Sequence, residues 1–564
     1  MRELVVHQIL FQTVHEHPDA EVVSPPVRTT YATLFERATR LANGLRRLGI
    51  GRGTVVGVLD INSSRYLELH YALSMLGAVL HPINFRLPAG ELLETVRRAG
   101  DEWLLVWEGF RDAMAGARPL FPHWLWLTDG ASEPEPGVPT LEGLVAEGEA
   151  ALPPEADGVH EDDWLSILFT TGTTGRPKGM RYRHRDLLLA SLQILHHLAL
   201  HEGGARLSSR DAVMPLIPFF HIHAWGTPFF VPYLGAKLVL AGRAGPAEQL
   251  ELILQEGVTW LNMVPTQLDM LLEAAAARRL ERLPVKVLTG GSALPAGLAS
   301  RARALGVRYS LIYGGSDQLA TAISVVPEEA DPESDEAAEA LRTGTRPLPM
   351  VEVEVRGADG RPVPHDGQTI GEVHVRSPWL PPEGYYGEPE ASASAYRDGW
   401  FRSGDLAVRL PNGLLYVVDR EKDAIKSGGE WIPSAVLEAV LSRHPGVASV
   451  AVLAQPDPRW GERPVAVVQP REGSPAPDEA ELRAFLEKAV EAGEIARFWI
   501  PDRVVAVPEL PVTSAGKIHK AALRAELGLA PAAGAGGGPA QAAVRGPGGG
   551  PAQAAPGPEE APGG

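Results

Sequence analysis

Apolar residues recur along the first half of the chain with two alternating spacings. In residues 29–48, Leu34, Leu41 and Leu45 fall on one face at helical spacing, and a largely apolar run follows at 54–61. Apolar positions three or four apart predict a helix with one buried face, whereas a short apolar run predicts a buried strand. The chain therefore begins with helix followed by strand.

The same alternation continues for about 240 residues. It predicts helices at 66–76 and 247–255, and strands at 78–82, 163–170, 238–241, 259–264 and 285–289. Strands that alternate with helices are typical of parallel α/β sheets. The predicted fold class is therefore α/β, with a large N-terminal domain of sheets and helices.

The pattern changes after residue 350. Residues 350–378 alternate apolar and polar positions between Gly and Asp turns, which predicts antiparallel strands in a small β-structured subdomain. The acidic segment 327–340 is expected to be an exposed turn or helix. A compact α+β stretch ends near Leu529, and the Ala, Gly and Pro residues that follow carry too little apolar surface to fold. We therefore predict a large N-terminal domain (1–418), a hinge (419–423), a small mobile C-terminal domain (424–529) and a disordered tail (530–564).

Composition excludes several classes of function. The chain of 564 residues has a formal net charge of −18, which argues against a nucleic-acid partner because phosphate backbones need a basic face. It has no cysteine, which excludes thiol catalysis, disulfides and cysteine-bound zinc. No signal peptide pattern and no apolar run of membrane-spanning length is present. These features predict a cytoplasmic protein without a transmembrane segment.

The lysines are unevenly distributed. Only eight of the 52 basic residues are lysines, and five of these eight fall in three short Gly-rich segments. They are Lys178, Lys422, Lys426, Lys517 and Lys520. A flexible ammonium group follows a moving phosphate or carboxylate better than a rigid guanidinium group does. This distribution indicates chemistry on phosphates.

A Gly- and Thr-rich loop, FTTGTTGRPKG at 169–179, follows the predicted strand 163–170. Its glycines allow backbone N–H groups to approach an anion, and its hydroxyls add donors. The spacing from Gly172 to Lys178 differs from that of the common ATPase loop. Taken alone, such a loop is more often an ordinary turn.

The loop is one of a series of motifs that occur in a fixed order. The others are GGSALP (290–295), YGGSD (313–317), GEVHVRSP (371–378), GWFRSGDL (399–406), DREKDAIKSGGEWI (419–432) and PVTSAGKIHKAALR (511–524). In these motifs the chain resembles the adenylate-forming superfamily, which includes acyl-CoA synthetases, luciferases and adenylation domains. The resemblance implies that a carboxylate attacks the α-phosphate of ATP and forms an acyl-adenylate.

The resemblance assigns ATP, Mg²⁺ and CoA as substrates or cofactors, with no tightly bound prosthetic group. The residues that it implies for ATP and AMP are Thr170, Thr171, Gly172, Thr173, Thr174, Gly175, Lys178, Gly291, Ser292, Ala293, Tyr313, Gly314, Ser316, Asp405, Arg420 and Lys426. It implies catalytic roles for Lys517, Lys178 and Thr170, and metal binding by Thr170 and Asp317. The superfamily usually has Thr-Glu where this chain has Ser316-Asp317, so the metal geometry is expected to differ.

The resemblance also implies a moving C-terminal domain. Lys422 falls at the pivot, and Ser427, Gly428, Gly429, Glu430 and Trp431 would line a channel for the pantetheine arm of CoA. From the residues alone, KSGGEW predicts a β-hairpin, and such a hairpin can be the part that swings.

The acyl site is read from PFFHIHAWG at 218–226. His221 and His223 could suggest a metal, but no third ligand is evident and the segment is apolar. The same segment resembles long-chain acyl-CoA synthetases, which implies that Trp225 is an acyl gate, with His221 and Gly315 in the pocket. Amino-acid-activating members of the superfamily usually place an Asp here to bind the amino group, and no Asp lies between Asp211 and Asp269, so the resemblance implies that an amino acid is not the substrate. Gly314 and Gly315 after Tyr313 leave room for a chain, and a medium- or long-chain fatty acid is favoured.

Several alternatives remain open. The chain could be an aryl or short-chain carboxylate-CoA ligase, or an acyl-AMP ligase that loads a separate carrier protein. A non-catalytic binder of acyl groups or nucleotides is a more remote reading, which the retained Lys178, Asp405 and Lys517 oppose. A homodimer is possible.

Overall fold

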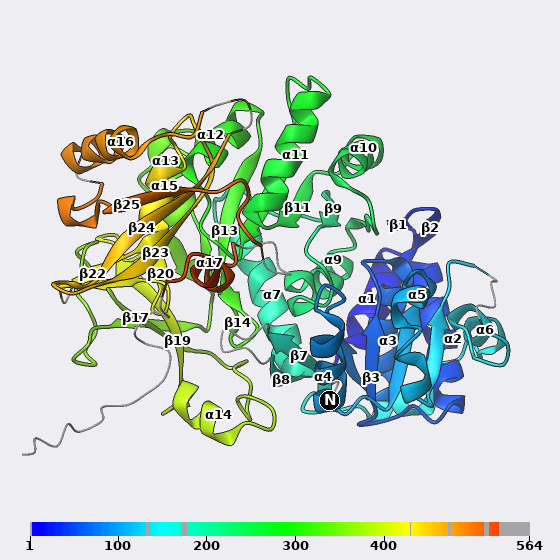
Figure 1. The fold of residues 1–564 in the computed structure, drawn as a ribbon. Helices are drawn as coiled ribbons and strands as arrows, with labels where there is room; N and C mark the ends of the chain where they lie inside the picture. The colour runs from blue at the N-terminus through cyan, green and yellow to red at the C-terminus, as the bar shows by residue number, and fades with distance from the viewer. Residues whose placement is uncertain are drawn as a thin grey trace, which may run out of the picture.

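Three β-sheets organise the chain, and the C-terminal one lies apart from the blue N-terminal sheet in Figure 1. The computed structural model describes residues 3–130, 135–170, 177–428, 430–471, 473, 475–492, 494–512 and 518–529. The predictions made for 171–176, Gly429, Lys517 and the tail 530–564 concern residues outside these ranges.

The first sheet has six strands in the order β6-β5-β3-β4-β7-β8, and only β8 runs antiparallel to its neighbour. Its strands are β3 (Val55–Leu59), β4 (Val79–Pro82), β5 (Trp103–Trp107), β6 (Trp124–Leu127), β7 (Trp164–Thr170) and β8 (Lys178–Arg183). The parallel arrangement predicted from alternating helices and strands is confirmed here. Because β7 ends at Thr170 and β8 begins at Lys178, both residues lie at one edge of the sheet.

Helices α2 (Tyr31–Arg47) and α3 (Ser64–Leu76) form where the apolar spacing predicts them. The Thr30 hydroxyl accepts a hydrogen bond from the N–H of Thr33 and so caps α2, while Ser63 caps α3 in the same way. Gly77 ends α3 with φ of 64°, a left-handed conformation that glycine adopts without strain.

The second sheet is long, and its strands are mostly parallel in one half and antiparallel in the other. From β1 to β13 its neighbouring strands are parallel, and from β13 to β16 they are antiparallel. The strands are β1 (Glu21–Ser24), β2 (Val27–Thr30), β9 (Ala212–Pro215), β10 (Lys237–Val239), β11 (Trp260–Met263), β12 (Lys286–Gly290), β13 (Arg308–Gly315), β14 (Leu319–Ser324), β15 (Thr345–Pro347), β16 (Glu352–Arg356), β17 (Gly371–Arg376), β18 (Tyr396–Arg397), β19 (Trp400–Arg409) and β20 (Leu415–Arg420). The antiparallel half confirms the strands predicted after residue 350.

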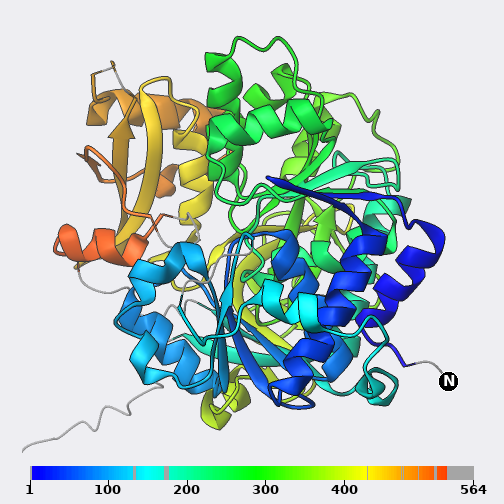
Figure 2. The same ribbon diagram turned by 90° about the vertical axis from the view of Figure 1, so that its right-hand side faces the viewer.

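The third sheet contains β21 (Ile425–Ser427), β22 (Glu430–Ile432), β23 (Val447–Asp457), β24 (Gly461–Pro470) and β25 (Arg503–Ala506). It packs on α15 (Ser434–Leu441) and α16 (Glu479–Glu491) around an apolar cluster of its own. The pairing of Ser427 with Glu430 confirms the predicted hairpin. Figure 2 shows this yellow and orange part beside the green helices of the larger part.

The other helices cover the faces of the sheets. They are α1 (His7–Glu16), α4 (Ala89–Ala99), α5 (Arg111–Met114), α6 (Leu141–Glu147), α7 (His184–Leu200), α8 (Ile222–Trp225), α9 (Thr227–Tyr233), α10 (Pro246–Glu256), α11 (Pro265–Ala277), α12 (Ala296–Ala304), α13 (Asp335–Thr343), α14 (Pro389–Ala395) and α17 (Lys520–Glu526). Helix α13 shows that the acidic segment is in part helical. Among the described residues, none of the helices is both long and apolar enough to cross a bilayer.

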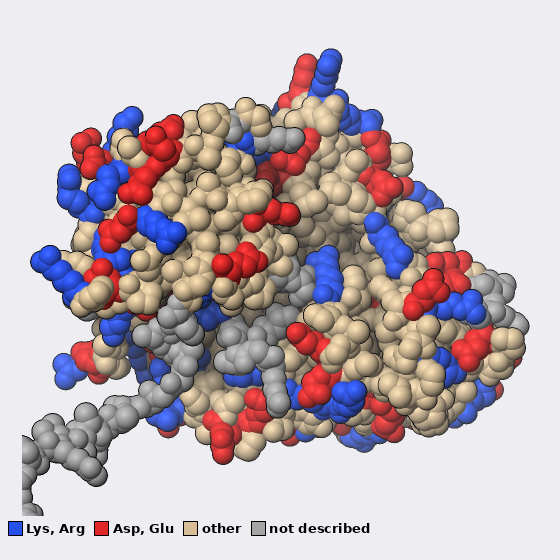
Figure 3. All heavy atoms as spheres, in the orientation of Figure 1, with Lys and Arg blue, Asp and Glu red and all other residues tan. Residues whose placement is uncertain are grey.

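The surface carries charge of both signs. On the face drawn in Figure 3, blue basic and red acidic side chains are interspersed. Nucleic-acid binding needs a concentrated basic face. The absence of a nucleic-acid partner stays a prediction.

The buried His197 of α7 provides a test of the packing. Its side chain is 2% exposed, and within the described part of the chain neither ring nitrogen has a hydrogen-bond partner. Burial, with the nearby His201 and Arg346, lowers the pKa of His197 from 6.5 to about 3. Below pH 6.5 the unfolded chain binds a proton here that the folded protein does not, so stability falls as the pH drops towards 3.

We expect His197→Leu to reduce this acid sensitivity. Between pH 7.5 and pH 5 the free energy of unfolding should fall by about 2 kcal/mol less in the variant than in the wild type. Denaturant titrations at both pH values measure the difference. His15→Leu, which replaces an exposed histidine, is the control, and an equal fall in His197→Leu and wild type would contradict the packing described.

Candidate active site

A single large cavity brings the sequence motifs together. Its volume is about 2190 Å³, and residues from both the large N-terminal part and the C-terminal sheet line it. Pockets for one small ligand usually measure about 300–1,000 Å³. A cavity of this size therefore has room for more than one substrate.

The first wall comes from the edge of the six-stranded sheet. Thr170 and Lys178 face each other across the β7–β8 pair, both are half-buried and both line the cavity. The Lys178 ammonium lies 4.3 Å from the centre of the Tyr385 ring, a cation–π contact. This contact holds a positive charge at the cavity wall where an anion can approach it.

The second wall follows the ends of β12 and β13. Gly291, Ser292 and Ala293 are exposed there, and the 313–317 segment adds Tyr313 and Asp317. These residues lie at or just after the carboxyl ends of β12 and β13. The two strands are paired in parallel, so their carboxyl ends lie side by side. Open α/β sheets bind ligands at the carboxyl ends of their strands.

The two glycines after Tyr313 differ in their roles. A Cβ at Gly314 would lie 2.1 Å from the Leu319 carbonyl oxygen, so the close approach of β14 requires glycine there. A Cβ at Gly315 would meet only the Asp317 carboxylate, at 3.8 Å. The packing of β14 by itself explains the glycine at 314. Room for an acyl chain therefore remains as the explanation of a glycine only at 315.

Asp317 is the acidic group of this wall. Burial raises its pKa, while the hydroxyl of Tyr385 and the cations Lys178 and Arg420 favour the ionised form. The Tyr396 hydroxyl donates to the Asp317 carbonyl at 2.7 Å and fixes the backbone. The carboxylate is thus held beside the cation of the opposite wall.

The residues that line the cavity suit an Mg²⁺ ion that takes most of its ligands from the phosphates of a substrate and only a few from the protein. Among the described residues no group of three or more His, Cys, Asp or Glu side chains could hold a metal ion without other ligands. Mg²⁺ commonly uses one or two carboxylates together with phosphates and water. The Asp317 carboxylate and the Thr170 hydroxyl are oxygen donors of this kind, and both line the cavity.

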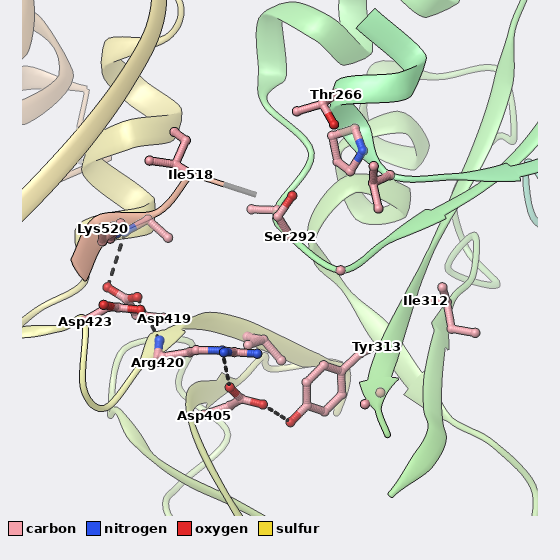
Figure 4. Close-up of a pocket in the computed structure, with 18 of the residues that line it drawn as sticks. Thr266, Ser292, Ile312, Tyr313, Asp405, Asp419, Arg420, Asp423, Ile518 and Lys520 are labelled. Carbon is pink, nitrogen blue, oxygen red and sulfur yellow. Dashed lines mark hydrogen bonds and ion pairs between the residues drawn. The ribbon is translucent and has the colours of Figure 1, made fainter. Parts of the chain in front are cut away.

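Asp405 connects the second wall to the hinge segment (Figure 4). The Tyr313 hydroxyl donates to Asp405 Oδ2 at 2.7 Å, and Arg420 Nε lies 3.4 Å from Asp405 Oδ1. Burial raises the pKa of Tyr313 well above its ordinary value, so the phenol keeps its proton. One carboxylate thereby orients an aromatic ring and a guanidinium group at the cavity.

The end of the chain reaches the same cavity. Ile518 and Lys520 line it, and Figure 4 shows Ile518 on the side of the cavity opposite Tyr313. Lys520 Nζ lies 2.7 Å from Ser434 Oγ and 2.7 Å from Glu438 Oε1. Ser434 Oγ donates to Asp419 Oδ2 at 2.7 Å. Burial opposes the charge of Lys520, yet Glu438 and Asp419 raise the pKa of Lys520 above its ordinary value.

The hairpin formed by β21 and β22 contributes fewer residues to this cavity than expected. Lys426 and Trp431 line it, and the Lys426 ammonium lies 5.4 Å from the centre of the Trp431 ring. Ser427 is buried, whereas Gly428 and Glu430 are exposed, and these three are not among the residues that line the cavity. Their place in a CoA channel remains a prediction, as does the pivot at Lys422, which lines the cavity.

The apolar end of the cavity is formed by an unusual turn. His221, Ile222 and Trp225 line it, and Trp225 is 7% exposed. Four residues in a row, 222–225, have φ between 47° and 57°, a left-handed conformation that costs about 1–2 kcal/mol for each residue with a side chain. His223 is buried and does not line the cavity, and its two ring nitrogens contact His70 and Ser166. His221 and His223 therefore do not form a metal-binding pair.

Four residues in or behind the site were given no functional role from the sequence: Tyr385, Lys520, His70 and Ser166. Tyr385 lies outside the motifs, and its position over Lys178 depends on a contact between segments about 200 residues apart. Lys520 does belong to the last motif, and its place among the clustered lysines was the available signal. His70 and Ser166 lie on a helix and a strand whose apolar pattern predicts only core positions.

The chain matches known proteins over most of its length. Residues 10–386 match the model of the AMP-binding enzyme family, and residues 436–517 match that of the AMP-binding enzyme C-terminal domain. The chain belongs to the AMP-binding enzyme family. The resemblance drawn from the motifs is thereby confirmed.

Individual relatives cover nearly the whole chain. A long-chain-fatty-acid–CoA ligase of Thermus thermophilus is 40% identical, with 88% of this chain and 90% of the relative covered. A feruloyl-CoA synthase of an Amycolatopsis species is 35% identical, with 88% and 94% covered. Among solved structures, the amide bond synthetase McbA of Marinactinospora thermotolerans superposes with a TM-score of 0.76 at 26% identity, with 92% and 99% covered. These matches confirm the predicted fold class.

The Lys520 cluster yields a prediction about stability. Lys520→Met would leave the half-buried Glu438 carboxylate without its cation, which should cost about 1–3 kcal/mol, between the values for exposed and fully buried ion pairs. We expect a fall of this size in the free energy of unfolding, measured by calorimetry and denaturant titration. The double variant with Glu438→Gln should recover part of the loss. Lys488→Met, on the exposed face of α16, is the control, and a loss no larger than in this control would contradict the assignment.

Proposed function

We propose that this enzyme is an ATP-dependent acyl-CoA synthetase that activates a fatty acid through an acyl-adenylate. The observation that carries the proposal is the convergence of Thr170, Lys178, Asp317, Asp405 and the 518–520 segment on one cavity. Membership of the AMP-binding family supplies the reaction class. The relatives named as CoA ligases support CoA as the acceptor.

In the first half-reaction, the carboxylate oxygen of the acid attacks the α-phosphorus of ATP, and the bond to pyrophosphate breaks. Lys178 would balance the charge of the phosphates, with hydroxyl and N–H donors at 170–175 around them. Ser292 and Tyr313 would border the adenine, and Asp405 would accept hydrogen bonds from the ribose hydroxyls. Lys517 would contact the carboxylate and the α-phosphate in this half-reaction.

Mg²⁺, held by the ATP phosphates with Asp317 and Thr170, would supply electrostatic stabilisation of the charge that develops on the phosphates. Burial raises the pKa of Asp317, and the chain's own part would be to support the ionised form of this carboxyl against that effect. Its neighbours Lys178, Arg420 and Tyr385 favour this form against the cost of burial.

In the second half-reaction, the thiolate of CoA attacks the acyl carbonyl carbon, and AMP leaves. We propose that the C-terminal domain (424–529) rotates at 419–423 between the two steps, with Lys422 as the pivot. One active site then serves two different nucleophiles. The hairpin residues Ser427, Gly428, Gly429, Glu430 and Trp431 would line the path of the pantetheine arm after rotation.

The apolar end of the cavity supports a fatty acid as the substrate. Ile217, Phe220, Ile222, Trp225 and Phe229 line this end. Burying apolar surface there stabilises an alkyl chain by about 0.8 kcal/mol for each methylene group. This dependence favours medium or long chains over acetate.

An aryl carboxylate is the second candidate. The same end carries the rings of Phe220, Trp225 and Phe229, against which an aromatic substrate could pack. The relative named feruloyl-CoA synthase supports this candidate. The two candidates differ in how activity depends on chain length.

A substrate profile tests the proposal. Pyrophosphate release with ATP and Mg²⁺ should rise from acetate to acids of medium or long chain, and CoA should convert the acyl-adenylate to acyl-CoA, as detected by mass spectrometry. Peak activity with benzoates or cinnamates would replace the fatty acid by an aryl substrate. Acyl-adenylate that accumulates unchanged by CoA would favour loading of a carrier protein, and the absence of release with every acid would contradict the synthetase.

The proposed role of Asp317 has its own test. Asp317→Asn removes the one carboxylate assigned to Mg²⁺ and should raise the Mg²⁺ concentration for half-maximal activity about tenfold, which corresponds to about 1.4 kcal/mol. Asp317→Glu, which keeps the carboxylate, should shift it less. A metal titration of Asp317→Asn that coincides with that of the wild type would remove Asp317 from this role.

A further inference from the structure

A chain of buried hydrogen bonds lies behind the apolar end of the cavity. His70 Nε2 lies 3.1 Å from His223 Nδ1, and His223 Nε2 lies 3.0 Å from Ser166 Oγ. The chain ends at two carbonyl oxygens, that of Tyr66, 2.8 Å from His70 Nδ1, and that of Leu80, 2.8 Å from Ser166 Oγ. The side chains of His70, His223 and Ser166 are at most 2% exposed.

The chain links three elements that are distant in sequence. His70 belongs to α3, His223 to the turn of α8, and Ser166 to β7. Burial lowers the pKa of His70 to about 4 and that of His223 well below its ordinary value, so both rings are neutral near pH 7. With both rings neutral, three protons serve these four contacts. His70 Nδ1 donates to the Tyr66 carbonyl oxygen, His223 Nδ1 donates to His70 Nε2, and the Ser166 hydroxyl donates either to His223 Nε2 or to the Leu80 carbonyl oxygen.

The turn that carries His223 does not hold its shape by local preference. Ile222, His223, Ala224 and Trp225 all have positive φ, and Ile222 is β-branched, which makes this conformation especially unfavourable. Such strain persists only where surrounding contacts determine the backbone, and it is concentrated at ligand sites. The contacts that fix this turn are therefore functional candidates.

Two sets of contacts hold the turn. The Ala224 carbonyl accepts hydrogen bonds from Asn262 Nδ2 at 2.8 Å and from Thr227 Oγ1 at 3.2 Å. The His223 ring is held at both nitrogens by His70 and Ser166. Because His223 is fixed in the core, its neighbours Ile222 and Trp225 are presented to the cavity.

We propose that His223, together with His70 and Ser166, forms a positioning unit that fixes the left-handed turn 222–225 and thereby sets the acyl-chain specificity of the enzyme. The inference deepens the proposed function and rests on it, since it takes the apolar end of the cavity as the acyl site. The ligand of this end is the alkyl or aryl part of a carboxylic acid. None of the three residues of the unit lines the cavity, so they act through Ile222 and Trp225.

The test separates positioning from general stability. His223→Leu keeps a similar volume but loses both hydrogen bonds, whereas His223→Gln keeps an amide that can both donate and accept. We expect His223→Leu to raise KM for the preferred acid at least tenfold and to flatten the chain-length profile, with KM for ATP within twofold of wild type. His223→Gln should restore most of the loss.

Two further variants keep the inference falsifiable. His197→Leu replaces a buried histidine outside the unit and should leave KM for the acid unchanged. If His223→Leu does not fold, Ser166→Ala removes only the terminal hydroxyl and should raise KM for the acid in the same direction. A folded His223→Leu or Ser166→Ala variant with the wild-type chain-length profile, or with equal rises in KM for acid and ATP, would overturn the proposal.

Hydrogen exchange distinguishes this proposal from the proposed function. Backbone amides at 222–226 should exchange at least tenfold faster in His223→Leu than in the wild type, whether or not any acid is turned over. A wild type that activates no acid but shows this difference would overturn the synthetase and the specificity role while retaining the turn-fixing contact. Unchanged exchange in a folded variant would overturn the positioning unit itself.

Discussion

The hydrogen bond from Tyr313 to Asp405 connects the two halves of the long sheet at the place where the site is built. Tyr313 lies on β13, the last parallel strand, and Asp405 lies on β19 in the antiparallel half. Asp405 also pairs in register with Arg420, the last residue of β20, so the same contact extends to the hinge segment. Open α/β sheets bind ligands at the carboxyl ends of their strands, which is where Tyr313 lies on β13. The bond of 2.7 Å brings a carboxylate from the antiparallel half to this place.

The two ends of the cavity are stabilised in different ways. At the end proposed to hold the nucleotide, charges of opposite sign face one another, and Lys178 is placed over the Tyr385 ring near the Asp317 carboxylate. These groups are costly to bury unless they are paired, so each one fixes the position of its partner. At the acyl end the lining is apolar, and the polar groups lie behind it in the core. The backbone there is determined by hydrogen bonds that no substrate touches.

This difference explains why the sequence predicts the charged end of the cavity better than the apolar end. Thr170, Lys178, Tyr313, Asp317 and Asp405 lie in short motifs, because backbone N–H groups near a phosphate require glycines and hydroxyls within a few residues. Strand and helix positions in the large domain were likewise evident from apolar spacing, since each element buries one face. The packing reason for the glycine at 314 could not be predicted, because the nearness of Leu319 depends on a bulged pairing of β13 with β14.

The contacts and the backbone of the apolar end could not be predicted from local sequence in this way. His70 and His223 are 153 residues apart, and nothing in either local sequence indicates that the two rings meet. The left-handed turn is opposed by the preferences of Ile222 and Trp225, so local propensity predicts a different backbone. Under the proposed function, substrate selectivity could therefore change without any change in the motifs assigned to phosphate. A single substitution among the buried His70, His223 and Ser166 would alter the turn, while the chemistry proposed at the α-phosphate would keep the same residues.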